Sequence, residues 1–103
     1  MTSIRFEWDD AKNRSNQRKH GVSFEIAARV FADPFALTEQ DRIEGGEMRW
    51  QTIGTVGGFT LLVVAHTIRD EDESKRPIEV IRIISARPAI RKERRRYEES
   101  EDR

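Results

Sequence analysis

Two Gly-Gly pairs, at residues 45–46 and 57–58, constrain the fold of this chain more than any other feature. They separate three stretches with the composition of β-strands, at residues 35–40, 47–56 and 59–68. Tight turns between antiparallel strands need positive φ, which glycine adopts readily. A fourth such stretch, residues 78–85, follows the charged residues 69–77, which we expect to form a loop. The centre of the chain is therefore predicted to be an antiparallel meander.

The N-terminal part predicts a short strand and then a helix. Residues 4–8 alternate apolar and charged side chains, the pattern of a half-buried strand. Asp9 and Asp10 can cap a helix over residues 11–20, which stops at Gly21. This helix has almost no apolar face, so the cap and the stop signal carry the prediction.

Two further helices are expected. Ser23 can cap the second one, whose apolar side chains follow helical spacing at Phe24, Ala27, Ala28 and Phe31. Proline at position 34 ends it, because the residue before a proline is disfavoured in the helical region. Pro88 is expected in the first turn of a C-terminal helix, where its missing N–H needs no partner, and Ile90 and Tyr97 would dock that helix.

The predicted order is β-α-α-β-β-β-β-α, an α+β fold in which helices pack on a small antiparallel sheet. At 103 residues we expect one domain over residues 1–103. Cysteine is absent, and no apolar run reaches the length of a membrane-spanning helix, so we expect a cytoplasmic protein that is not in a membrane.

Positive charge is concentrated near the C-terminus. The whole chain is neutral, with 19 Lys and Arg residues and 19 Asp and Glu residues. Residues 87–96, however, carry six basic side chains against one acid, Glu93. Such a local field suits phosphate or RNA, while a solvated helix face, paired with the acids that follow, is the alternative. Arg91 and Arg94 belong to this helix.

Arg82 lies among isoleucines in the last predicted strand, so it needs a partner or an opening onto a cleft. An internal salt bridge to Glu7 or Glu47 and a functional role are both open. Arg69 and Arg87 end two neighbouring strands. If these strands pair antiparallel, the two arginines lie at opposite edges and cannot reach one phosphate unless residues 69–77 fold over.

Histidines and carboxylates offer few other candidates. His66 lies in an apolar strand, which favours a structural role over a catalytic one. His20 ends the first predicted helix, where helix capping and phosphate contact remain equal alternatives. The acids at residues 9–10 and 70–73 could hold Mg²⁺, but acidic runs are more often solvated loops, so no metal site is predicted.

Several short motifs follow one another along nearly the whole chain. They are FEWD at residues 6–9, KHGVSFEIA at 19–27, VFADP at 30–34, GEMR at 46–49, IG at 53–54 and RIISARPAIRKERRRY at 82–97. In this order they resemble the BrnT toxins of bacterial type II toxin–antitoxin modules. The resemblance implies a RelE-like fold, metal-independent RNA cleavage that inhibits translation, and neutralisation by a BrnA antitoxin whose ribbon-helix-helix domain binds DNA.

The resemblance also implies a set of site residues. RNA cleavage by the ribose 2′-OH needs a base, an acid and cations on the phosphoryl oxygens. We assign Arg82 and Arg87 to the phosphate, with Arg69 as a helper, and Lys19 or His20 as base or acid. RNA contacts are expected from Arg49, Ser85, Arg91 and Arg94.

Two other functions remain open at this point. The same basic patch would suit a non-catalytic module that binds RNA or the ribosome. The chain could also be a structural partner in a DNA-bound regulatory complex. In each case we expect a hetero-oligomer with an antitoxin, and no cofactor is implied.

Overall fold

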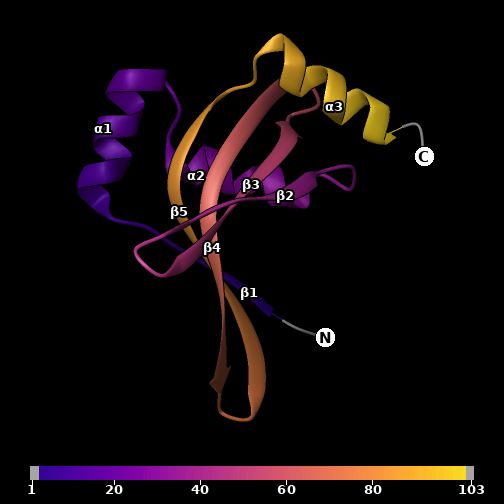
Figure 1. Ribbon diagram of the computed structural model, residues 1–103. Helices are drawn as coiled ribbons and strands as arrows, with labels where there is room; N and C mark the ends of the chain where they lie inside the picture. Colours follow the sequence, from indigo (N-terminus) through magenta and orange to yellow (C-terminus); the bar gives the residue numbers. More distant parts are fainter. Residues whose placement is uncertain (1–2, 102–103) are drawn as a thin grey trace.

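The computed structural model describes residues 3–101, which form one five-stranded sheet with helices around it (Figure 1). The elements are β1 (Ser3–Glu7), α1 (Asp10–His20), α2 (Phe24–Ala27), the 3₁₀ helix η1 (Ala28–Ala32), β2 (Leu37–Glu44), β3 (Glu47–Val56), β4 (Thr60–Glu73), β5 (Arg76–Pro88) and α3 (Arg91–Glu101). The α+β class and the predicted element order are confirmed. The second predicted helix is shorter than expected, because it changes to 3₁₀ geometry after Ala27.

The sheet order is β1-β5-β4-β3-β2. Strands β2 to β5 form the predicted antiparallel meander, whereas β1 pairs parallel with β5, from Ser3 opposite Ile78 to Glu7 opposite Arg82. The sheet is therefore mixed rather than purely antiparallel. A parallel pair requires a long crossover connection, and most of the chain lies between these two strands.

The expectation of a loop at residues 69–77 was wrong. β4 and β5 continue as a hairpin that projects beyond the rest of the sheet, with a two-residue turn at Ser74 and Lys75 (Figure 1). Both turn residues have positive φ, as a tight hairpin turn requires. No helix covers the projecting part of these strands, so their side chains are exposed to water and can be charged. The hairpin is held by backbone pairing and does not require apolar residues on its faces.

The prediction for Pro88 was also wrong, because Pro88 is the last residue of β5 and α3 begins at Arg91. The start of α3 is instead stabilised by Glu93, whose carboxylate accepts a hydrogen bond of 2.9 Å from the backbone N–H of Ile90. Tyr97 docks α3 as expected, but Ile90 is 58% exposed and does not.

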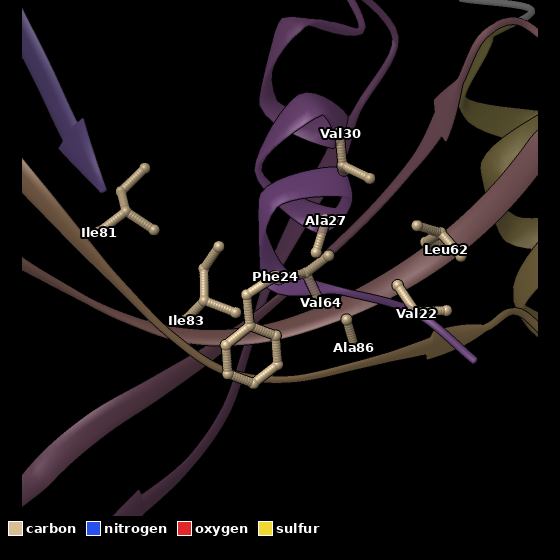
Figure 2. Packing of buried hydrophobic residues seen from close by; sticks show 9 residues of the cluster. All are labelled: Val22, Phe24, Ala27, Val30, Leu62, Val64, Ile81, Ile83 and Ala86. Atoms are coloured by element: carbon tan, nitrogen blue, oxygen red, sulfur yellow. The ribbon is translucent and has the colours of Figure 1, made fainter. Parts of the chain in front are cut away.

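The two faces of the sheet carry separate apolar clusters. The larger one joins α2 and η1 to β4 and β5, and Figure 2 shows Phe24 beside Ile83 and Ala27 beside Val64. The smaller one holds Ile53, Leu61 and Val63 against Tyr97 of α3. Alternate residues of β4 belong to different clusters, as the period of a strand requires.

No helix of the described residues is long and apolar enough to cross a membrane.

Candidate active site

Helix α1 lies along β5 beyond the end of β1 (Figure 1), where the strand would otherwise have a free edge. Asn16 replaces the missing strand. Its side-chain oxygen accepts from the N–H of Ala86 at 3.1 Å, and its amide nitrogen donates to the carbonyl oxygen of Ala86 at 2.8 Å. The same nitrogen donates to the carbonyl oxygen of Val22 at 2.8 Å. A buried asparagine thus fixes the distance between α1 and β5.

A second asparagine completes the attachment of α1. Asn13 accepts from the backbone N–H of Phe24 at 2.9 Å and donates to the carboxylate of Glu25 at 2.8 Å. The helix begins at Asp9, which accepts from the N–H of Lys12, and ends at Gly21, whose φ of 72° is the left-handed cap. A helix with little apolar surface is therefore held by buried amides.

A depression of about 180 Å³ lies at the junction of α1 and β5, and we call it the α1–β5 depression. Its lining consists of Lys12, Ser15, Asn16, Lys19, His20, Ile84 and Ser85. The residues from α1 recur at helical spacing, so they form one stripe along the helix. The strand side is shaped by a bulge, because Ala65 pairs with Ser85 but His66 pairs with Ile83. Three basic side chains and two hydroxyl groups therefore surround one concave site.

Arg82 lies next to this site, in a depression of about 270 Å³ lined by Glu7, Trp8, Asp9 and Arg82, which we call the Arg82 depression. The salt bridge of Arg82 to Glu7 or Glu47 is not formed. Arg82 is exposed, and among residues 3–101 its guanidinium takes part in no ion pair. The backbone N–H of Lys12 chiefly, and the charge of Arg82 in addition, lower the pKa of Asp9.

Arg69 is close to Arg82 but is held by acids. It pairs with Glu7 and with Glu71, and in β4 it lies opposite Val80, two residues from Arg82. The hydrogen bond from Arg69 lowers the pKa of Glu7. Its positive charge is thus already balanced.

Arg87 lies at the other end of the sheet, opposite Val63. Its guanidinium binds the carboxylate of Glu93 in a bidentate way, at 2.8 and 2.7 Å. This contact lowers the pKa of Glu93 and fastens the start of α3 to β5. The register confirms that Arg69 and Arg87 are far apart. Arg82 and Arg87, five residues apart on one strand, are separated by roughly 16 Å, so they do not reach one phosphate oxygen together.

The remaining predicted RNA contacts lie outside the α1–β5 depression, apart from Ser85. Arg49 is on β3, two strands away from β5, and lies 3.5 Å from the carboxylate of Glu44. Arg91 and Arg94 are exposed on α3.

His66 has the structural role that its sequence context favours. It is fully buried, its Nε2 lies 2.8 Å from the hydroxyl of Thr52, and its ring meets Phe31 edge-on at 5.0 Å. Burial lowers its pKa to about 4, so the ring is neutral at neutral pH.

The sequence model of the family described as "Ribonuclease toxin, BrnT, of type II toxin-antitoxin system" matches residues 8–93. The chain belongs to the BrnT toxin family. Members of this family are ribonuclease toxins of type II toxin–antitoxin systems, and an antitoxin is therefore the expected partner of the chain. The match covers α1, β5 and both depressions except for Glu7.

A solved structure supports the fold of this BrnT family member. The crystal structure of the Brucella abortus ribonuclease toxin BrnT is similar with a TM-score of 0.56 and 21% identity, and the match covers 87% of this chain and 100% of that one. A search of curated proteins finds no match to the chain.

Lys12, Ser15 and Trp8 line the two depressions but were not predicted as site residues from the sequence. Lys12, Ser15 and Lys19 recur at i, i+3 and i+7, which places them on one face of the helix, but only the cap and the stop signal of this helix were considered in predicting it from the sequence. Trp8 lies in a motif of the BrnT family resemblance but was assigned only to a strand. Among the described residues of this BrnT family member, no three His, Cys, Asp or Glu side chains lie close enough to hold a metal ion.

Proposed function

We propose that this chain is an endoribonuclease that cleaves RNA without a metal ion, by attack of a ribose 2′-OH on the adjacent phosphorus, and that it thereby inhibits translation. The observation that supports this most is the α1–β5 depression, which Lys12, Lys19 and His20 line together with Ser85. Cations fixed around one concave site can stabilise the charge that develops on the phosphoryl oxygens.

In this proposal the reaction proceeds in one displacement. A base removes the proton of the 2′-OH, the O2′–P bond forms and the P–O5′ bond breaks. An acid then protonates the departing O5′, which leaves a 2′,3′-cyclic phosphate and a 5′-OH. Lys19 and His20 are neighbours at the end of α1 and are our candidates for base and acid. Lys12 would hold the phosphate, and Ser85 would donate a hydrogen bond to it.

Asn16 makes this arrangement rigid. Because it bonds the backbone of Ala86 in both directions, α1 cannot slide along β5 without breaking two buried hydrogen bonds. When the spacing between catalytic groups is fixed, acids and bases of only moderate strength can still accelerate a reaction substantially.

Arg69 and Arg87 have a smaller part in the proposal than their sequence positions suggested. Each guanidinium already binds a carboxylate, and Arg87 has its partner in α3. Arg49, Arg91 and Arg94 are proposed to contact RNA outside the reacting phosphate, where exposed cations contribute sequence-independent affinity.

We further propose that the partner is a BrnA-like antitoxin with a ribbon-helix-helix domain, that DNA is contacted only through it, and that the complex acts in the cytoplasm as a hetero-oligomer. Co-expression with such an antitoxin would give a complex that copurifies and that lacks RNA cleavage. Recovery of the chain alone would contradict this part.

Incubation of the purified chain with RNA in EDTA tests the reaction. The proposal predicts fragments with 2′,3′-cyclic phosphate ends, detected by mass spectrometry. Intact RNA at a large excess of protein would refute it, and RNA binding under the same conditions would then favour a non-catalytic RNA-binding module. Tight operator binding by the chain alone would favour a structural role on DNA.

A further inference from the structure

The Arg82 depression has a mixture of charges that a phosphate site would not have. Arg82 supplies one cation and Asp9 one carboxylate, while the carboxylate of Glu7 on the same rim is already paired with Arg69. Register places Glu7 directly opposite Arg82, on the same face of the sheet. The carboxylate of Asp9 beside Arg82 disfavours a phosphate at this position, whereas its oxygens remain available as hydrogen-bond acceptors.

The groups in this depression match the edge of a nucleobase instead. A carboxylate accepts from paired N–H donors, and an arginine fork donates to paired acceptors. Of the four RNA bases, guanine alone has both, with N1–H and N2–H₂ on one edge and O6 and N7 on the next. Arginine paired with O6 and N7 is the commonest specific contact to guanine.

Trp8 supplies the remaining element of a base site. Trp8 is half-buried and is one of the residues that line the depression, and its ring lies edge-on against Phe24 at 6.2 Å between ring centroids. Unstacked RNA bases bind proteins by stacking on aromatic rings while their edges form hydrogen bonds. The volume of about 270 Å³ leaves room for one base.

We propose that the Arg82 depression binds a guanine of single-stranded RNA, with Asp9 accepting from its N1–H and N2–H₂, Arg82 donating to its O6 or N7, and Trp8 packing against the ring. The inference rests on the proposed function only in that RNA is the ligand. Asp9 precedes Lys12 by one helical turn, so this guanine lies immediately beside the phosphate held in the α1–β5 depression. Arg82 is thus a specificity residue rather than a phosphate ligand.

Asp9→Asn is the most informative variant. Asparagine caps a helix as well as aspartate does, so α1 keeps its start while the depression loses one of its two carboxylates. Arg82→Gln is the second variant, since the Arg82 guanidinium has no ion pair among the described residues and its loss does not endanger the fold. Asp41→Asn, at an exposed position of β2, is the matched control.

The probes are short 2′-O-methyl oligonucleotides that differ at one position, which is G, A, C or U. They cannot be cleaved, so dissociation constants measure binding alone. We expect the G probe to bind roughly tenfold or more tightly than the others, as one good bidentate contact provides. Asp9→Asn and Arg82→Gln should each reduce this preference to about twofold or less on the same principle, whereas Asp41→Asn should keep it.

The inference is overturned if the parent prefers another base, if it prefers none, or if a G preference survives in both Asp9→Asn and Arg82→Gln. Cleavage of unmodified RNA is measured in parallel. Cleavage without any guanine preference leaves the proposed function standing and the inference refuted. Guanine preference in binding without cleavage leaves the inference standing and refutes the proposed function.

Discussion

The burial of His66 makes the stability of the protein depend on pH in a definite way. In the folded protein its pKa is about 4, against 6.5 for a free histidine. The unfolded chain therefore takes up the proton more readily than the folded one. Stability from this residue is complete above pH 6.5 and is lost as the pH falls through 6.5 toward 4.

The size of the effect follows from the two pKa values. The difference between 6.5 and about 4 corresponds to about 3 kcal/mol once His66 is protonated in both states, and to about 2 kcal/mol at pH 5. Other groups also destabilise the fold in acid, because hydrogen bonds from Arg69 and Arg87 lower the pKa values of Glu7 and Glu93. A comparison with a variant that lacks only the titrating ring is therefore needed.

His66→Gln provides that comparison, because glutamine is polar, does not titrate and can still reach the hydroxyl of Thr52. The free energy of unfolding is measured by urea denaturation for both proteins between pH 8 and pH 4.5. The advantage of the parent over His66→Gln should shrink by about 2 kcal/mol between pH 8 and pH 5. A difference that stays constant with pH would refute the reasoning.

Three further substitutions test the attachments in the fold. Glu93→Gln removes the negative charge and one of the two acceptor oxygens that bind Arg87, which should lower the free energy of unfolding by about 2 kcal/mol in urea denaturation. An unchanged free energy of unfolding would contradict this role. Gly54→Ala places a Cβ 2.8 Å from Cγ1 of Val30, so thermal unfolding should show a loss of about 1–3 kcal/mol, and an unchanged midpoint would show that η1 moves freely. Asn16→Leu leaves the N–H and C=O of Ala86 without their hydrogen bonds, so hydrogen exchange at the Ala86 amide should become much faster. Unchanged protection of this amide would mean that the Asn16 side chain does not bond the edge of β5.

Local signals in the sequence were sufficient for most of the fold. The Gly-Gly pairs at 45–46 and 57–58 do form the two predicted turns, and all four glycines have positive φ. The caps Asp9 and Ser23 start their helices through hydrogen bonds to the N–H groups of Lys12 and Ile26. These features depend only on neighbouring residues, which is why the sequence predicts them.

Features that depend on distant contacts were not predictable in the same way. The parallel pairing of β1 with β5 joins residues more than 70 positions apart. The buried asparagines of α1 look like solvated residues until the free edge of β5 is known. The charged residues 69–77 resemble a loop, although Ser74 and Lys75 close a hairpin there.

The candidate site shows the same division. Lys19, His20 and Ser85 were singled out from the sequence, and the structure brings them together. The sequence could not show that Arg87 is bound by Glu93 and Arg69 by Glu7, because both ion pairs depend on which strands and helices meet. Nor could it place Lys12 opposite β5, since that contact follows from the docking of α1.

RNA cleavage is proposed to take place in the α1–β5 depression. The most direct measurement is the initial rate of cleavage of one RNA in EDTA by the parent, by Lys19→Gln and by His20→Gln, with Lys92→Gln on the exposed side of α3 as the control. Loss of a proton-transfer or phosphate-binding group should slow cleavage by roughly 100-fold or more in at least one of the first two, with unchanged far-ultraviolet circular dichroism. Lys92→Gln should cleave within about threefold of the parent, since it removes only one exposed charge. Full activity in both Lys19→Gln and His20→Gln would contradict the account.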